Sequence, residues 1–436
     1  MSNHLSFEQE QIKTIFLQGK SLFITGAGGT GKTHLIRDLI NSTYLKEPDS
    51  VVTAMTGCAS ILIHDNAKTL ASWSGIGIAN TEDEKIIERI RKNKVYRKNW
   101  SRVQVLFVDE VSMMSKRTFE LLDKIARKIR KCDIMFGGIQ MIFCGDFFQL
   151  PPIPDEFDKG IHCFKSPLWK ELFGENQFEL TTNFRQEDEE YSKILNDIRY
   201  GKISGKTKKQ LESRINVKPP PDLNCVELYA TRYRVDVINE KFNDQIESTC
   251  QVFNPLLIDE NGFPVNSEKY KSVIRCNSNA TFRDKSLILK VGSQVMCTVN
   301  IDMHSKKQKI VNGSTGVVVK FSPDGFPVVK FTNGRVLTFL PHTIDFEAFG
   351  KTYSFKTMPL ILSWAISIHK SQGATLDNAI IDCGNSIFEA GQIYVALSRI
   401  KSLKGLYLKG FDFSKIIIKK SVLEFYHSLK SRCIHA

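Results

Sequence analysis

The segment from Gly26 to Thr33, GAGGTGKT, has the residue types and spacing of a loop that binds phosphate groups. Glycines let the backbone curl until its N–H groups point at phosphate oxygens, and a following helix adds the positive end of its dipole. Lys32 would reach the β- and γ-phosphates of a nucleotide, and the Thr33 hydroxyl would bind Mg²⁺. The alternative is a glycine-rich turn without a ligand. The apolar run before the loop, Leu22–Thr25, and the periodic segment after it, Leu35–Ile40, favour the nucleotide site.

Two adjacent acids, Asp109 and Glu110, follow the apolar run Val103–Val108. A fully apolar strand suits a parallel sheet that is covered on both faces, so both acids would emerge at its carboxyl end beside the loop. Asp109 would hold Mg²⁺, directly or through water, and Glu110 would orient or deprotonate the attacking water. The alternative is a charged strand exit, which is common for one acid and less common for such a pair.

Two glutamines are candidate contacts for the nucleotide. Gln149 follows the apolar run Gln140–Cys144, where a neutral amide would sense the γ-phosphate. Gln9 lies three residues after Ser6 at the start of a periodic segment, which is the spacing of a helix-capping box. The other interpretation of Gln9 is a contact with the donor and acceptor edges of adenine. Arg185 in the segment Asn183–Gln186 would reach a phosphate, or is a surface arginine.

A second group of residues suggests contact with a polyanion. Thr56 and Gly57 follow the short strand Val51–Ala54, at the strand end where open α/β sheets bind ligands. Thr69 and Trp73 come next; the indole would stack on a base or lie in the core. The basic run from Lys85 to Arg102 is a solvated helix face or part of a nucleic-acid path. His369 by itself is more typical of a structural histidine.

Composition narrows the class of protein. The 436 residues carry a formal net charge of +13 at pH 7, which favours a polyanionic partner and also promotes solubility. The ten cysteines have no CxxC spacing, so neither zinc nor a disulfide scaffold is indicated. We expect no membrane span and no leader, and we expect an intracellular location, in the nucleus, the cytoplasm or a viral replication site.

Turn and linker residues divide the chain. The stretch Lys218–Asp222, KPPPD, is a stiff linker, after which Val226–Ala230 starts a second α/β unit. Between residues 285 and 346, turns at Asp324-Gly325 and Asn333-Gly334 separate short alternating strands, which predicts an inserted small β-barrel. The α/β pattern resumes near Leu360, with the strand Ala379–Asp382 and a helix over Gln392–Arg399.

Six stretches in this order resemble the Pif-type (petite integration frequency) DNA helicases, in the RecD-like branch of helicase superfamily 1. They are GAGGTGKT, LFVDEVSM, FGGIQMIFCGDFFQLPP, ELTTNFRQ, LILSWAISIHKSQGATLDNAIID and GQIYVALSR. The likeness runs from Leu5 to about Gly410. FCGDFFQLPP and SIHKSQGATL are highly specific to that family.

The resemblance implies an α/β protein of two RecA-like P-loop NTPase domains, with a small wedge subdomain and an inserted SH3-like β-barrel. The first domain would span 1–217 with the wedge at about 78–102, the second 222–284 with 347–436, and the barrel 285–346. Such proteins hydrolyse ATP to move 5′ to 3′ on single-stranded DNA and part duplexes, in replication, repair or recombination. We therefore expect ATP and Mg²⁺ as cofactors, single-stranded and forked DNA as partners, no membrane, and a monomer on DNA.

The resemblance also implies roles for single residues. Arg399 would be an arginine finger supplied in cis, Arg185 would contact the γ-phosphate, and Gln149 would couple that phosphate to DNA. The expected catalytic residues are Lys32, Asp109, Glu110, Gln149, Arg185 and Arg399. Those expected to bind nucleotide are Gln9, Gly26, Ala27, Gly28, Gly29, Thr30, Gly31, Lys32, Thr33 and Gly373, with Thr33 and Asp109 as metal ligands. Those expected to bind DNA are Thr56, Gly57, Thr69, Trp73, His369 and Ser371.

Departures and alternatives remain. Met55 stands where the family usually has proline, and Ala71 where it usually has histidine, which leaves open how the protein contacts DNA. Long flanking regions are lacking, which predicts a minimal helicase core. One alternative is an RNA helicase or a translocase that strips proteins from nucleic acid. A GTPase is disfavoured because the nearest guanine-reader string, Asn93-Lys94-Val95-Tyr96, lacks its aspartate. A non-enzymatic binding protein is disfavoured by the presence of Lys32, Asp109 and Glu110 together.

Overall fold

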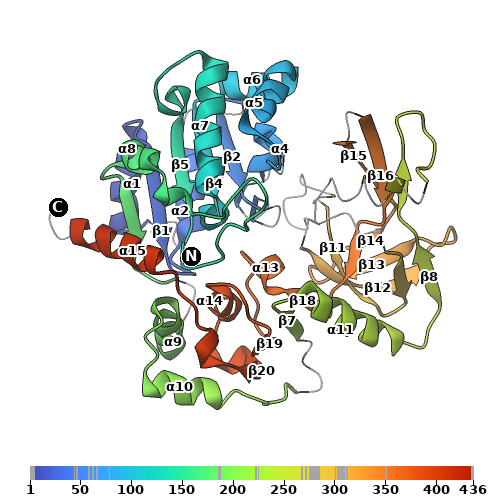
Figure 1. Ribbon diagram of the computed structural model, residues 1–436. Helices are drawn as coiled ribbons and strands as arrows, with labels where there is room; N and C mark the ends of the chain where they lie inside the picture. The colour runs from blue at the N-terminus through green and yellow to red at the C-terminus, as the bar shows by residue number, and fades with distance from the viewer. Residues whose placement is uncertain are drawn as a thin grey trace. The chain divides into compact units, whose positions relative to one another are not determined.

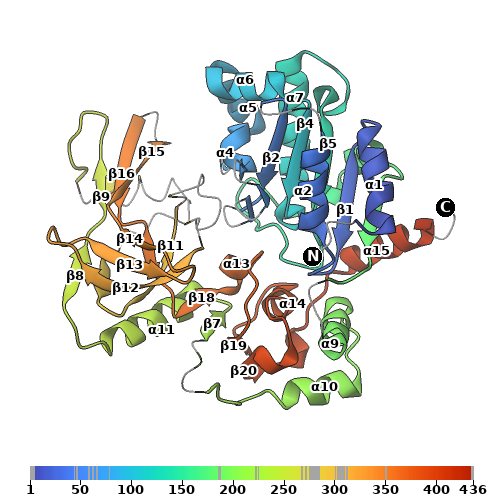
Figure 2. The same cartoon turned by 180° about the vertical axis from the view of Figure 1, so that it is seen from behind.

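The fold was obtained as a computed structural model (Figures 1 and 2). It describes residues 5–43, 45, 48–56, 59–60, 63–64, 67–77, 79–184, 188–220, 223, 225–266, 269–270, 273, 285–299, 301, 310, 313–348 and 351–433. The chain divides into two compact units, residues 1–231 with 367–436, and residues 232–366. Among the described helices, none has the length and apolar character needed to cross a membrane.

The first unit is built on a six-stranded sheet in the order β3-β2-β4-β5-β1-β6. Every pairing in it is parallel, and nearly all residues of its four central strands are buried. This confirms the parallel α/β sheet that the apolar runs predict. The strands are β1 (Leu22–Gly26), β2 (Ser50–Ala54), β3 (Lys68–Thr69), β4 (Val105–Asp109), β5 (Gln140–Cys144) and β6 (Gln177–Leu180).

Helices cover both faces of this sheet (Figures 1 and 2). On one face, α1 (Phe7–Leu17) and α2 (Lys32–Ser42) place Phe16 and Leu35 in a core with Ile24 and Phe107. On the other face an aromatic layer joins the sheet to three helices: the Phe23 ring lies 5.0 Å from that of Trp169 and 5.9 Å from that of Phe425. These helices are α7 (Lys116–Arg130), α8 (Pro167–Phe173) and α15 (Lys420–Cys433).

Three further helices lie in the region 70–102, namely α4 (Leu70–Ser74), α5 (Asp83–Lys92) and α6 (Lys94–Arg102). The basic run is therefore two helices and not one, because Asn93 ends α5 and its side chain caps α6. Trp100 is fully buried and its indole N–H donates to the Ser74 carbonyl. Asp83 forms ion pairs with Arg117 and Lys124 of α7, which fixes α5 on the first unit.

A second parallel sheet in the first unit contains β7 (Val226–Tyr229), β19 (Ala379–Cys383) and β20 (Leu406–Phe411). Its paired strands β7 and β19 come from segments about 150 residues apart, as the interrupted α/β pattern predicts. The helices of this region are α9 (Glu189–Tyr200), α10 (Gly205–Glu212), α13 (Ile368–Ser371) and α14 (Gln392–Leu397). Short 3₁₀ turns complete the unit at Val111–Met113, Met135–Gly138, Cys163–Lys165, Leu403–Gly405 and Phe413–Lys415.

The second unit is mainly antiparallel β-structure. Its main sheet has the order β14-β13-β12-β11-β17, and the predicted hairpins are confirmed, with Gly325 and Gly334 at positive φ in the two turns. Two smaller sheets pair β10 with β8, and β15 with β16 and β9. The elements are α11 (Arg232–Asp244), β8 (Cys250–Phe253), β9 (Leu256–Ile258), β10 (Leu287–Lys290), β11 (Gln294–Cys297), β12 (Thr315–Phe321), β13 (Pro327–Phe331), β14 (Val336–Thr338), β15 (His342–Ala348), β16 (Lys351–Thr357), β17 (Leu360–Leu362) and β18 (Ala365–Ser367), which crosses the unit boundary.

Candidate nucleotide-binding site

The loop between β1 and α2 has a backbone that only glycine adopts without strain. Gly26, Gly29 and Gly31 have φ values of 148°, 94° and 79°. A Cβ on Gly26 would lie 2.6 Å from Thr30 Oγ1 and 2.7 Å from the Leu180 carbonyl oxygen, so a side chain has no space there. The Thr30 hydroxyl donates to the Ala27 carbonyl at 3.0 Å. The loop is thus a fixed turn that presents its amides at the N-terminus of α2.

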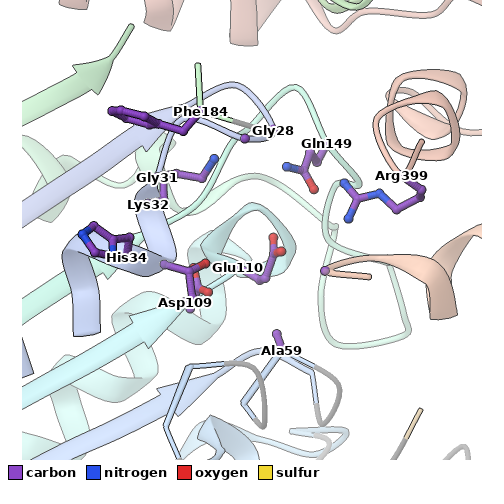
Figure 3. Close-up of a pocket in the computed structure, with 13 residues that line it drawn as sticks. Gly28, Gly31, Lys32, His34, Ala59, Asp109, Glu110, Gln149, Phe184 and Arg399 are labelled. Atoms are coloured by element: carbon purple, nitrogen blue, oxygen red, sulfur yellow. The ribbon is translucent and has the colours of Figure 1, made fainter. Parts of the chain in front are cut away.

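A cavity of about 250 Å³ lies at this loop and belongs entirely to the first unit (Figure 3). It collects residues from the carboxyl ends of β1, β4 and β5 and from α14, which is where a doubly covered parallel sheet binds ligands. Five of the six predicted catalytic residues line it, and the sixth, Arg185, lies outside the described residues. The lining residues are Gly28, Gly29, Gly31, Lys32, Thr33, His34, Ala59, Asp109, Glu110, Gln149, Phe184, Gly373 and Arg399.

Lys32 is held over the loop that precedes it. Its ammonium group donates to the carbonyl oxygens of Gly26 at 2.7 Å and Ala27 at 2.9 Å. An ammonium on a flexible stem exchanges such neutral acceptors for phosphate oxygens at little cost, because ionised partners bind it more strongly. Lys32 is therefore placed to move from the loop to a phosphate in the cavity.

The two acids emerge from β4 as predicted. Burial, together with the negative charge of Glu110, raises the pKa of Asp109 to about 7. A divalent cation would oppose that shift, since positive charge favours the ionised form. Asp109 and Thr33 both line the cavity and could supply two oxygens to Mg²⁺. Among the described residues no cluster of three or more His, Cys, Asp or Glu suits a metal ion, so phosphates and water would supply the other ligands.

Glu110 has a strained backbone. Its φ of 56° and ψ of 39° are left-handed, which a non-glycine residue adopts at a cost of roughly 1–3 kcal/mol. Its carboxylate accepts a hydrogen bond from Nε2 of Gln372 at 2.9 Å, and the same nitrogen lies 3.4 Å from Oε1 of Gln149. Sequence reasoning missed Gln372. The available signal was its amide side chain directly before Gly373, but no apolar pattern surrounds it that would have predicted a buried position.

Arg399 enters the cavity from the end of α14, where it points toward Gln149 (Figure 3). Arg399 is only 2% exposed. It donates to the carbonyls of Val395 at 2.9 Å and Ala374 at 3.3 Å, and to the Ser398 hydroxyl at 2.8 Å. These acceptors hold the side chain in one orientation, so a developing negative charge in the cavity would meet an oriented cation.

A buried polar network joins the phosphate loop to α14, and sequence reasoning missed it. The Tyr394 hydroxyl accepts the Gly28 N–H at 3.0 Å and donates to Asp146 at 3.2 Å. Asp146, which has no exposed surface, also accepts two hydrogen bonds from Arg199 and one from Tyr426. Burial raises the pKa of the Tyr394 phenol well above its ordinary value, so it stays protonated and can donate.

At the other end of the loop, Gln9 and Phe184 flank Gly31. The capping box predicted for Gln9 is present, because its Oε1 accepts the Ser6 N–H and the Ser6 hydroxyl accepts the Gln9 N–H. The Gln9 Nε2 is buried and makes no hydrogen bond within the described part of the chain. A Cβ on Gly31 would lie 3.0 Å from this nitrogen and 3.2 Å from the Phe184 ring, which is 59% exposed. An aromatic face and a free amide donor thus lie beside the loop.

The residues predicted to contact DNA are more scattered. Thr56 and Thr69 cap the turns that follow them, through hydrogen bonds from the amides of Ala59 and Ser72. The Trp73 ring is 4% exposed and lies 4.9 Å from that of Trp100, so the structure favours its core role over base stacking.

On α13, the Ser371 hydroxyl is buried and donates to the Ile368 carbonyl. His369 is half-buried and its ring stacks 6.5 Å from that of Phe388. Gly57 lies outside the described residues.

Comparison with known proteins gives consistent matches. A family model described as PIF1-like helicase matches residues 4–209. The ATP-dependent DNA helicase PIF1 of Danio rerio is 36% identical over 441 residues, which cover 99% of this chain and 65% of that protein. The ATP-dependent DNA helicase RRM3 of Saccharomyces cerevisiae is 31% identical and covers 98% of this chain and 68% of that protein. The chain thus spans about two thirds of the length of these relatives.

Solved structures match over nearly the whole chain. The Pif1 helicase of Candida albicans has a TM-score of 0.86 at 34% identity, covering 98% of this chain and 99% of that one. The Bacteroides Pif1 helicase in complex with ADP-AlF3 and single-stranded DNA has a TM-score of 0.72 at 27% identity, covering 98% of each chain. A structure described as two coordinating Pif1 helicases at forked double-stranded DNA has a TM-score of 0.76 at 27% identity, covering 98% of each chain.

Proposed function

Because the chain belongs to the PIF1-like helicase family, we propose that it is an ATP-dependent DNA helicase that moves 5′ to 3′ on single-stranded DNA and unwinds duplexes. The observation that carries the proposal is the cavity in which the phosphate loop, the Asp109–Glu110 pair and Arg399 meet. Phosphoryl transfer from a nucleotide needs little more than such positioned charges. The Bacteroides relative bound to ADP-AlF3 and single-stranded DNA supports both ligands.

The proposal assigns one role to each of the main residues at the nucleotide site. Lys32 and the loop amides bind the β- and γ-phosphates, while Thr33 and Asp109 hold Mg²⁺. Glu110 orients or deprotonates the attacking water, and Gln149 senses the γ-phosphate. Arg399 stabilises charge that develops in the transition state, an effect that can be worth roughly 10³–10⁵ in rate. Gln9 and the exposed Phe184 ring are placed to receive the adenine, by a hydrogen bond and by stacking.

We also propose the domain assignment that the resemblance implies. The two RecA-like domains would be 1–217, which holds the six-stranded sheet, and 222–284 with 347–436, which holds β7, β19 and β20. Residues 232–284 and 347–366 of the second domain belong to the second compact unit. Residues 78–102, with α5 and α6, would be the wedge, and 285–346 would be the inserted SH3-like barrel. The antiparallel sheet of β11 to β14 supports the barrel, although that sheet continues to β17, beyond residue 346.

The proposed partners are single-stranded and forked DNA, in replication, repair or recombination. The charge of +13 favours them, and it predicts binding that is largely independent of base sequence and weakens with salt. Thr56, Thr69, His369 and Ser371 remain the proposed backbone contacts. The proposal takes a monomer as the active species, and the two coordinating helicases of the forked-DNA relative are the alternative to be tested by titrating protein over a fixed fork.

Unwinding of matched substrates tests the function. We expect the protein, with ATP and Mg²⁺, to unwind a 5′-tailed DNA duplex and to leave a 3′-tailed duplex and the RNA versions intact. Unwinding only of 3′-tailed or only of RNA substrates would overturn the proposal. Release of a bound protein without strand separation would favour a stripping translocase.

Two variants test the assigned roles. Glu110→Gln should bind ATP normally but lose turnover, and normal turnover in that variant would refute the role of Glu110. Arg399→Ala should lower kcat far more than ATP affinity, because the arginine acts on the transition state. A loss of affinity alone would make Arg399 a binding residue.

A further inference from the structure

Gln372 is a buried residue whose role is not accounted for by the nucleotide contacts proposed above. It is 1% exposed and is not among the residues that line the cavity, but its side chain is bonded to two that are, Glu110 and Gln149. Its Nε2 donates to Glu110 Oε2 at 2.9 Å and to Gln149 Oε1 at 3.4 Å. One nitrogen thus joins the carboxyl ends of β4 and β5 to the end of α13.

The chemistry of these groups dictates the orientation of the amide. An ionised carboxylate can only accept hydrogen bonds, and an amide oxygen can only accept, while an NH₂ group has two hydrogens to donate. The Gln372 nitrogen therefore has one hydrogen for each neighbour. A flipped amide would place its oxygen against two acceptors, which is repulsive in a buried site. The Gln372 oxygen makes no hydrogen bond within the part of the chain described.

The backbone of Gln372 is set by α13. It is the C-cap of this helix, and its N–H donates to the His369 carbonyl at 3.4 Å. The helix is closed at its other end by Ser367, whose hydroxyl accepts the Lys370 N–H. A displacement of α13 would therefore move the amide nitrogen away from Glu110. The bond that this nitrogen donates to Oε2 of Glu110 therefore ties the orientation of the carboxylate to the position of α13.

We propose that Gln372 is a positioning residue for ATP hydrolysis, which orients the Glu110 carboxylate and makes that orientation depend on α13. The inference rests on the proposed ATPase function and adds a residue to it. Since α13 carries His369, a proposed DNA contact, DNA that contacts this helix steadies the amide, and the amide steadies Glu110. Gln372 acts through Glu110 and does not itself touch the nucleotide.

The primary test replaces Gln372 by methionine, which has a similar shape and no N–H donor. The assay is steady-state ATP hydrolysis with saturating and with no single-stranded DNA, together with equilibrium binding of a fluorescent ATP analogue. We expect DNA-stimulated kcat to fall about 10- to 100-fold, as for loss of a group that orients a reacting residue. The KM for ATP and the dissociation constant of the analogue should change less than about threefold.

A double-mutant cycle separates positioning from general damage. In the Glu110→Gln background, where the carboxylate is gone, Gln372→Met should change the residual single-turnover rate less than about twofold. An undiminished fall in that background would show that Gln372 does not act through Glu110 and would overturn the inference. The second variant, Gln372→Glu, places a carboxylate opposite Glu110 and should lower kcat at least as much.

Gln177→Met is the matched control. Gln177 is a buried amide at the first residue of β6 that does not line the cavity, and it is bonded to Trp169 and to the Gly174 carbonyl. It should lower thermal stability and leave kcat per folded protein unchanged. If the wild-type protein shows no DNA-stimulated hydrolysis, the proposed function fails. If the wild type is stimulated and both folded Gln372 variants keep normal kcat, only the role of Gln372 fails.

Discussion

Replacing Arg199 by leucine tests the buried network that joins the phosphate loop to α14. Arg199 donates from Nε and Nη2 to the two oxygens of Asp146 at 3.1 and 3.0 Å, and from Nη1 to Glu179 at 3.1 Å. Its guanidinium also lies over the rings of Phe148 and Tyr426, at 4.5 and 5.0 Å from their centroids. Asp146 has no exposed surface, so it depends on this arginine for its compensating charge.

The expected loss follows from what the substitution leaves behind. Asp146 would keep hydrogen bonds from Tyr394, Tyr426 and the Phe148 amide, but no positive charge would remain beside it. Removing one partner of a buried ion pair costs about 3–5 kcal/mol, because the other charge stays buried and unpaired. Arg199→Lys, which keeps the charge but not the two-pronged geometry, should lie between leucine and wild type.

Urea unfolding followed by tryptophan fluorescence measures this loss. Trp169 reports on the same unit, since its ring lies 5.8 Å from that of Phe147, the residue after Asp146. Arg91→Leu is the control, because Arg91 is exposed and pairs only on the surface with Glu88, so the free energy of unfolding should barely change. A loss below about 1 kcal/mol for Arg199→Leu would refute the reasoning, since it would mean that Asp146 is solvated or neutral in the folded protein.

Three further predictions concern the same unit. Tyr394→Phe removes the hydroxyl that accepts the Gly28 N–H, so we expect a destabilisation of about 1–3 kcal/mol in urea unfolding and a change in the KM for ATP; unaltered values for both would contradict a link between α14 and the loop. Phe184→Ala should weaken binding of ATP and ADP equally in fluorescence titration, whereas an effect on ATP alone would exclude stacking on the base. Burial and the charge of Lys419 lower the pKa of His162 to about 4, below its unfolded value, so the unfolded chain binds the proton first and stability is lost as pH falls from about 6.5 to 4. His162→Phe should therefore lose about 2 kcal/mol less than wild type between pH 7 and pH 5 in urea titrations, and equal losses would refute the assignment.

The sequence predicted the central strands because their signals are local. Gln140–Cys144 is predicted and observed with the same bounds, since six largely apolar residues, Ile139 to Cys144, lie between a glycine pair and Gly145. The hairpins of the second unit follow for the same reason, because Gly325 and Gly334 mark turns that need positive φ. The phosphate loop, Asp109, Glu110 and Gln149 were each predicted from polar groups at the end of an apolar run, whereas the role of Arg399 came from the family resemblance.

The features of the fold and site that the sequence did not predict depend on contacts between distant segments of the chain. β9 pairs with β16 and β11 with β17, over about 100 and 65 residues, and no local pattern specifies either partner. The Asp146 network joins α9, α14 and α15 in the same way. Trp73 is the clearest example of what the sequence could not predict. An aromatic residue among small hydroxyl residues fits either a surface or a core, and the contact with the ring of Trp100 is what places it in the core.

A glutamine side chain can have a structural role and a functional role at the same time. The amide of Gln9 uses its oxygen to close the capping box and leaves its nitrogen beside Gly31. The amide of Gln372 uses its nitrogen to hold Glu110 and Gln149 and leaves its oxygen without a described partner. Each side chain has a donor end and an acceptor end, so one end can serve the fold while the other serves a ligand or a catalytic group. A structural role established for such a residue is therefore no argument against a functional one, and the two are separated by comparing Gln→Glu, which removes the donor and keeps an acceptor, with Gln→Met, which removes both.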